Sequence, residues 1–375
     1  MPQSLTKIPA GMKYYLGREA TLRRSIEQTA LSVFAGWSYE QIVTPAVDYY
    51  ALFELGMGEE AERAFRFTDS DGRLLALRPE LTSTIARAVA TLFSKRPRPL
   101  RLCYAAPVFR QQPPSHTEWR REVTQVGCEL IGRNSQAADL EVLLVASEFL
   151  RNLDLSGTFV ITLNDLEIFN GIAADLNLYS KLRHELRELI DLRNAADLET
   201  FLAPFDPHGR VREFTQLLQL SGKREIFEKA RRVITNPRST LALANLESLW
   251  ITIEELGLYE YFDVDLADIS RLDYYTGLTF KIYVEGVGVR IGGGGRYDSL
   301  IGNFGMAEPA VGFVVEVDPL AELLRNDRHL TQEDKVEIVE VGTRDLSAVF
   351  GDAMESRVRG KQIVINFSEE TTCLS

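Results

Sequence analysis

Cysteine is scarce in this sequence. The 375 residues include three cysteines, Cys103, Cys128 and Cys373, and no two of them form a C-x-x-C pair. An odd number of widely spaced cysteines argues against a disulfide framework and against a thiolate zinc site. We therefore expect a chain that works in a reducing compartment, the cytoplasm, without a metal ion or another cofactor.

Long apolar runs and an excess of positive charge are also missing. No window approaches the length of a transmembrane helix, and the first residues lack the apolar core of a signal peptide, so no membrane association is expected. The chain has 42 Lys and Arg against 54 Asp and Glu, a formal charge of −12. This balance argues against a broad phosphate-binding face, although it is compatible with a local basic patch.

Hydrophobic periodicity predicts a chain that mixes helices and strands. Apolar residues at helical spacing predict helices over residues 18–36, 83–93 and 135–153. Runs of β-type residues predict strands over residues 39–44, 65–69, 74–77, 100–110, 122–132 and 159–164. Residues 165–257 have weak strand signals and are expected to be helical, while a strand, a helix and a strand over residues 336–341, 345–359 and 362–367 predict a small βαβ unit.

A glycine-rich stretch between Asp268 and Leu320 is the most distinctive part of the sequence. Two β-type runs, residues 278–284 and 287–291, flank a Gly-containing turn and predict a hairpin. Four consecutive glycines follow, and a strand interior tolerates such a run poorly unless a backbone or a ligand comes very close. The run is not followed by the Lys-Ser/Thr pair of a P-loop, so it is weak evidence for a nucleotide-binding enzyme.

The expected strand at residues 122–132 carries polar side chains on one face. Side chains alternate along a strand, so Gln125, Gly127 and Glu129 should share a face. At a rise of ~3.3 Å per residue, the Cα atoms of Gln125 and Glu129 should lie about 13 Å apart, with space over Gly127 for a small polar molecule. A buried carboxylate needs a partner, which such a molecule could supply. Taken alone, the pattern also fits a sheet with a solvent-facing polar side.

Three motifs occur in a fixed order: L-D-Y-Y-T-G from Leu272, G-G-G-G-R-Y-D from Gly292 and P-A-V-G-F from Pro309. Together they resemble the histidine-binding half of histidyl-tRNA synthetase, and R-P-E-L-T at residues 78–82 resembles the R-P-E-G-T of that family. The resemblance implies an α+β fold of the class II aminoacyl-tRNA synthetase type, an antiparallel sheet flanked by helices. Residues 1–325 would form the histidine-binding core, with a helical insertion at about 170–257, and residues 326–375 a truncated C-terminal α/β module.

The same resemblance assigns contacts with histidine to eight residues, namely Glu80, Leu81, Thr82, Arg110, Gln125, Glu129, Tyr274 and Tyr275. All but Leu81 keep the residue type of the family. Glu80 would lie on a strand-to-helix turn, where a carboxylate either faces a ligand amine or caps the helix. The two tyrosines would wall the imidazole, and core packing is the alternative reading of the pair.

Two positions that the resemblance links to catalysis depart from the synthetase. Ser270 stands where the family has an arginine that holds the carboxylate and the α-phosphate, and the neighbouring Arg271 should point to the opposite face. Pro319 replaces an arginine that binds ATP phosphate, and Glu316 and Asp318 bring negative charge close to that position. Adenylate formation needs cations where charge develops, so we expect histidine binding to survive and activation by ATP to be lost.

A synthetase-like chain that binds histidine without activating it resembles the regulatory subunits of ATP phosphoribosyltransferase, the first enzyme of histidine biosynthesis. The resemblance implies a non-catalytic homodimer, formed through the synthetase-like core. It would assemble with a short-form catalytic subunit into an active hetero-oligomer and mediate feedback inhibition by L-histidine. Stable tRNA binding is not expected, because residues 326–375 have six Lys or Arg against ten Asp or Glu. The alternatives are an active histidyl-tRNA synthetase and a stand-alone histidine sensor.

Overall fold

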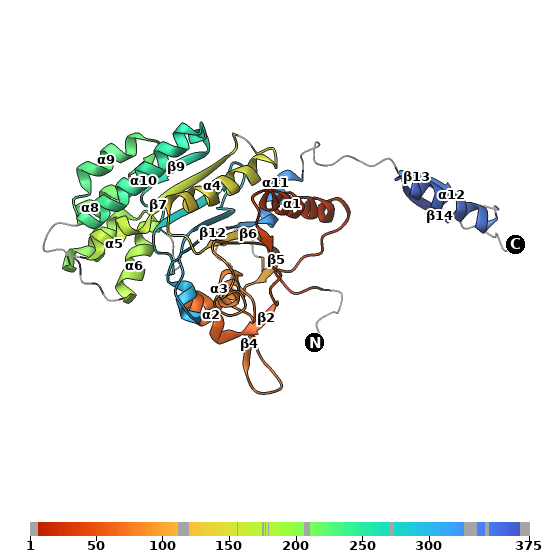
Figure 1. Cartoon of the computed structure of the whole chain (residues 1–375), viewed down its shortest axis with the longest axis horizontal. Coiled ribbons are helices and arrows are strands. Elements are labelled where there is room, and N and C mark those ends of the chain that lie inside the picture. Colours follow the sequence, from red (N-terminus) through yellow and green to blue (C-terminus); the bar gives the residue numbers. More distant parts are fainter. Residues whose placement is uncertain are drawn as a thin grey trace. The chain divides into compact units, whose positions relative to one another are not determined.

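A computed structural model describes residues 7–111, 120–155, 157–174, 176, 178, 180–205, 211–269, 274–325, 336–341 and 345–367. The chain divides into two compact units, Met1–Arg325 and Asn326–Ser375. Figure 1 shows that the first unit is built on one large sheet with helices on both faces and a group of helices at one end. None of the helices in the described ranges is both long and apolar enough to cross a membrane.

The large sheet has nine strands in the order β1-β5-β6-β12-β11-β10-β7-β9-β8. The six strands β5-β6-β12-β11-β10-β7 in the middle of the sheet are all antiparallel to their neighbours. By contrast, β1 pairs with β5 in parallel, and so does β7 with β9. The strands span Glu40–Gln41, Leu100–Phe109, Glu122–Ile131, Ala310–Glu316, Gly292–Arg296, Leu278–Val284, Phe159–Asp165, Phe262–Asp265 and Ser221–Gly222, in that spatial order. The predicted α+β class is thus confirmed, with a mixed sheet whose middle is antiparallel.

The glycine run is itself a strand, which the sequence did not lead us to expect. Strand β10 ends at Val284, and its antiparallel partner is β11, Gly292–Arg296, so the predicted strand at residues 287–291 was wrong. A Cβ atom added at Gly292 or Gly294 would come within 2.2 or 2.1 Å of a carbonyl oxygen of β12. The run therefore allows neighbouring backbones to approach closely, which is one of the two reasons considered for it.

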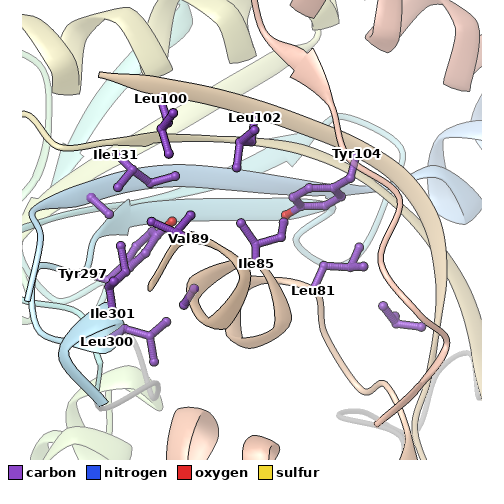
Figure 2. Packing of buried hydrophobic residues seen from close by; sticks show 13 residues of the cluster. Leu81, Ile85, Val89, Leu100, Leu102, Tyr104, Ile131, Tyr297, Leu300 and Ile301 are labelled. Carbon is purple, nitrogen blue, oxygen red and sulfur yellow. The ribbon is translucent and has the colours of Figure 1, made fainter. Parts of the chain in front are cut away.

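Helices α1, Gly17–Gly36, and α4, Gln136–Arg151, cover one face of the sheet (Figure 1). The apolar stripe of α1 is buried, and Phe34 meets Phe313 of β12 edge-on, with ring centroids 5.8 Å apart. Helix α3, Thr82–Thr91, covers part of the opposite face, where Ile85 and Val89 pack against residues of β5 (Figure 2). The amphipathic helix predicted at residues 18–36 and the helix predicted at residues 83–93 are confirmed within two residues at each end.

The remaining elements of the first unit extend this framework. A three-stranded sheet, β2-β4-β3, joins Val47–Tyr49, Leu74–Leu77 and Arg66–Thr68. The helical group contains α5 to α10, and α2 and α11 lie outside it. These eight helices span, in chain order, Tyr50–Met57, Leu166–Ala174, Ser180–Asp191, Ala195–Leu202, Val211–Leu217, Glu225–Val233, Pro237–Glu255 and Val317–Leu324. Short 3-10 turns cover Gly58–Arg63, Ala203–Phe205, Tyr259–Tyr261 and Leu300–Phe304.

The second unit has the strand–helix–strand order expected from the sequence. Strands β13, Val336–Glu340, and β14, Gln362–Asn366, pair in parallel, and α12, Leu346–Val358, connects them. The carboxylate of Asp345 accepts a hydrogen bond from the Ala348 N–H at 3.2 Å, so Asp345 caps the start of α12.

Candidate functional site

The face of the sheet that α3 covers carries most of the predicted site residues. In the register of β6 and β12, Glu129 lies opposite Gly312, and Gln125 lies opposite Glu316. On the other side of β6, Gly127 lies opposite Tyr104. Directly opposed residues point to the same face. Gln125 and Glu129 therefore share a face as alternation predicts, and both are almost fully buried, at 3% and 2% exposure.

Glu129 is held by three hydroxyl groups. Tyr297 donates to its Oε2 at 2.5 Å, while Thr82 and Tyr104 donate to its Oε1 at 3.2 and 3.4 Å. Gly312 makes room for the carboxylate, since a Cβ atom there would lie 1.7 Å from Oε2. Burial raises the pKa of Glu129 to about 8, although the three hydroxyl groups act in the opposite direction. The carboxyl thus titrates near neutral pH and can meet a cation or an N–H group of a ligand.

Glu80 approaches the same place from the start of α3. Its carboxylate accepts the N–H of Ser83 at 2.9 and 3.2 Å, so it caps the helix. Burial raises the pKa of Glu80 against these hydrogen bonds, and its charge helps to raise the pKa of Glu129. Glu80 accepts the Ser83 N–H while the adjacent Thr82 donates to Glu129, so both carboxylates meet at the start of α3. A positively charged group between them would stabilise both ionised forms. Leu81, between Glu80 and Thr82, points into the apolar cluster around Ile85 (Figure 2).

The tyrosine pair stands beside these carboxylates. The ring centroids of Tyr274 and Tyr275 are 4.7 Å apart, and Tyr274 meets Tyr297 edge-on at 6.0 Å. Burial, together with the charges of Glu80 and Glu129, raises the phenol pKa of both, that of Tyr275 to about 12. The pair therefore stays neutral and forms an aromatic wall of the site.

Arg110 lies at the Gln125 end of the site, already engaged by the protein. Its Nε donates to the carbonyl oxygen of Pro79 at 3.0 Å, and its Nη1 lies 3.2 Å from Oε1 of Glu316. The structure thus brings seven of the eight predicted side chains to one side of the sheet, and Leu81 packs into the core beside them.

The space that we expected over Gly127 is occupied. A Cβ atom at Gly127 would lie 2.6 Å from the hydroxyl oxygen of Tyr104, so this tyrosine covers the glycine. Gly127 thus makes room for the Tyr104 side chain and not for a ligand. The candidate ligand position instead lies where Glu80, Glu129 and Tyr274 come together. The sequence did not indicate Tyr104 and Tyr297 as site residues, and it placed Glu316 near ATP without showing its contact with Arg110.

Comparison with known proteins places this arrangement in a family. The histidyl-tRNA synthetase family model matches residues 11–320. The chain is 33% identical over 343 residues to the ATP phosphoribosyltransferase regulatory subunit of Halothermothrix orenii, covering 91% of this chain and 81% of that one. The corresponding subunit of Moorella thermoacetica is 34% identical over 362 residues, covering 96% and 92%.

A solved structure gives the same answer. The crystal structure of an ATP phosphoribosyltransferase regulatory subunit/histidyl-tRNA synthetase from Bacillus halodurans matches with a TM-score of 0.88 and 28% identity, over 99% of this chain and 95% of that one. The chain belongs to the family of histidyl-tRNA synthetase-like ATP phosphoribosyltransferase regulatory subunits. The family resemblance drawn from the three motifs is thereby confirmed.

Of the two positions where the sequence is expected to depart from the synthetase, Pro319 lies at the start of α11. Pro319 is the third residue of α11, within the first turn, where a proline needs no N–H partner. The charge of Asp318 is neutralised by Arg23 and Arg120, each 2.7 Å away, so it does not act as free negative charge at the site. The other departure, Ser270, lies outside the described residues together with Arg271.

Proposed function

We propose that this regulatory subunit binds L-histidine between Glu80, Glu129 and the tyrosine pair. Binding would transmit feedback inhibition to the short-form catalytic subunit of ATP phosphoribosyltransferase in histidine biosynthesis. The observation that supports this most strongly is the pair of neighbouring carboxylates beside an aromatic wall. A ligand with an ammonium group and an imidazole N–H complements two carboxylates, and a planar ring complements tyrosine faces.

Each of the eight residues has a role in this proposal. Glu129 accepts the imidazole N–H and Glu80 the ammonium, while Gln125 and Arg110 serve the polar end of the ligand. The Thr82 hydroxyl orients Glu129, to which it is hydrogen-bonded at 3.2 Å. Tyr274 and Tyr275 stack on or beside the ring, and Leu81 supports Thr82 from the core.

The subunit itself forms no adenylate in this proposal and needs no cofactor. The arginines that would face ATP phosphates in a synthetase are replaced by Ser270 and Pro319. Arg110, which remains, is paired with Glu316. Phosphoryl transfer chemistry depends on cations that stabilise the transferring phosphates, and the loss of each costs orders of magnitude in rate.

Assembly completes the proposal. The synthetase-like core forms a homodimer, and the homodimer joins the catalytic subunit in a cytoplasmic hetero-oligomer that lacks stable tRNA binding. The charge of −12 is consistent with protein partners rather than RNA. Histidine favours one conformation of the dimer, and that conformation favours an inhibited catalytic subunit.

Reconstitution tests this function. The rate at which a short-form catalytic subunit forms phosphoribosyl-ATP is measured with and without the purified chain, across a histidine titration. We expect the chain to raise the rate and histidine to suppress it. Glu129→Gln should keep the activation and lose the response to histidine. A chain that leaves the rate unchanged, or a variant that responds to histidine like the parent, would contradict the proposal.

A further inference from the structure

Arg110 is engaged by a carboxylate of the protein at the place where a ligand would need it. Glu316 is the last residue of β12 and lies opposite Gln125 in the register of the sheet. Its Oε1 lies 3.2 Å from Nη1 of Arg110. The two side chains are 22% and 28% exposed, so the pair sits at the rim of the site and not inside the core.

This ion pair differs from two structural arginine pairs in or beside β5. Arg101 holds Glu141 through two N–H groups, Nε at 2.7 Å and Nη2 at 2.8 Å. Arg98 holds Glu308 through Nε and Nη2 in the same forked way. Arg110 instead gives its Nε to the carbonyl oxygen of Pro79 and one Nη1 contact to Glu316. A single long contact is weaker than a fork and easier to exchange.

An amino acid brings a carboxylate that must find a cation in this site. In their ionised forms Glu80 and Glu129 repel a ligand carboxylate, because like charges in a shared low-dielectric site are unfavourable. Among the eight residues assigned to histidine, Arg110 is the one with a positive charge. A ligand carboxylate at the Gln125 end of the site would therefore compete with Glu316 for the same guanidinium.

We propose that Glu316 is an affinity-setting residue that competes with the α-carboxylate of the bound amino acid for Arg110. This inference rests on the proposed function, since it takes histidine as the ligand of the site. On binding, Arg110 exchanges Glu316 for the ligand carboxylate, and the Glu316 carboxylate turns to solvent. The competition from Glu316 weakens the affinity of the site for histidine. It affects only those ligands that carry a carboxylate.

Two ligands distinguish the exchange of Glu316 for the ligand carboxylate from other effects of substituting Glu316. Calorimetric titrations of the full chain use L-histidine and histamine, which carries the same ring and amine without a carboxylate. Glu316→Gln should bind histidine about two- to fivefold more tightly, the range expected for a rim ion pair. Its affinity for histamine should be unchanged or slightly lower, since a negative charge near the amine has been removed.

Arg110→Met supplies the second arm. It should lose about ten- to a hundredfold in histidine affinity, the range for a charge-assisted hydrogen bond, and little in histamine affinity. In the Arg110→Met background, Glu316→Gln should no longer tighten histidine binding. Glu308→Gln is the matched control, because it removes the carboxylate of a forked pair outside the site and should leave both affinities unchanged.

The outcomes distinguish the inference from the proposed function. If the parent chain binds histidine and Glu316→Gln binds it no more tightly, the exchange is refuted and the proposed function stands. An equal gain for histamine would refute it in the same way. A parent chain that binds no histidine overturns both. If Glu316→Gln proves misfolded by thermal unfolding, Glu316→Asp, whose shorter side chain weakens the contact, must show the same selective gain.

Discussion

Glu129 is the residue whose environment says most about the site. A glutamate carboxyl has an ordinary pKa of 4.5, and burial raises the pKa of Glu129 to about 8. Between these two values the unfolded chain releases the proton while the folded chain keeps it. The folded state then binds more protons than the unfolded state, so its stability falls as pH rises through this window. An unliganded site of this kind carries a stability cost that a cationic or N–H ligand relieves.

Substitution of Glu129 should therefore stabilise the empty protein. Glu129→Gln keeps the shape and removes the ionisable group, so the free energy of unfolding should rise by on the order of 1 to 3 kcal/mol at pH ~8. At about pH 4, where both states are protonated, the gain should vanish. Chemical unfolding at the two pH values checks this, with Glu308→Gln as the control. A variant that is less stable than the parent at the higher pH would show that the carboxyl is not disfavoured by burial.

Asp318 ties several elements of the core together. Its buried carboxylate accepts hydrogen bonds from Arg23 and Arg120 at 2.7 Å, from the Tyr15 hydroxyl at 2.6 Å and from the Thr124 N–H at 2.9 Å. Burial acts to raise the pKa of Asp318, but the Arg23 and Tyr15 hydrogen bonds outweigh it and hold the pKa below 3.8. Through these hydrogen bonds, Asp318 connects the start of α11 to α1, to β6 and to the segment before α1.

Removing this charge should destabilise the first unit. Asp318→Asn leaves two arginines without their carboxylate, and breaking a buried pair costs about 3 to 5 kcal/mol. Because the folded pKa is lowered, the stabilisation is present above the ordinary pKa of 3.8 and fades as pH falls below it, so the variant and the parent should converge in acid. Denaturant unfolding measures the difference. Glu355→Gln, in an exposed pair with Arg359, should cost under about 1 kcal/mol. A similarly small loss for Asp318→Asn would contradict this account of α11.

Strand β11 depends on glycine for a reason that can be tested directly. In Gly294→Ala, the new Cβ would lie 2.1 Å from the Gly312 carbonyl oxygen and 2.7 Å from the Phe313 Cβ, so β11 and β12 would have to separate. We expect a loss of about 1 to 3 kcal/mol in the free energy of unfolding, together with weaker histidine binding. Gly288→Ala is the control, because nothing lies within 4 Å of a Cβ there. Equal stability of the two variants would show that β11 and β12 can accommodate a Cβ atom at Gly294 without separating.

The same strands show how far sequence reasoning reaches. Alternation along β6 placed Gln125 and Glu129 on one face, because the period of a strand is a local property. The apolar stripe of α1 and the βαβ order of the second unit were predictable for the same reason. Helix and strand periods are set by neighbouring residues and do not require knowledge of the partner.

What escaped prediction depends on strand register. Tyr104 covers Gly127 because β5 and β6 pair in a particular alignment, and Glu316 reaches Arg110 because β12 pairs with β6 in another. A register joins residues that are far apart in the chain, so no local pattern reveals it. The glycine run was not predicted to be a strand, and only the register shows that the close neighbour is the backbone of β12 and not a ligand.

At the scale of the whole molecule, the proposed function couples a histidine site to the catalytic subunit through assembly. If histidine weakens the catalytic activity of the hetero-oligomer by favouring one state, thermodynamic linkage requires the catalytic subunit to change the affinity for histidine by the same coupling factor. We expect the apparent Kd for histidine to shift by about 5- to 150-fold when the catalytic subunit is added. Calorimetric titration with and without that subunit measures this shift. Identical affinities in the two titrations would refute the coupling.

The central claim is that a synthetase-type site binds histidine here without activating it. Histidine-dependent ATP–pyrophosphate exchange, measured on the full chain at a histidine concentration that calorimetry shows to be saturating, tests it most directly. We expect saturable histidine binding and an exchange rate no higher than that of a reaction without histidine, because in the proposed function Ser270 and Pro319 stand where a synthetase has phosphate-binding arginines. Brisk exchange that depends on histidine would contradict it.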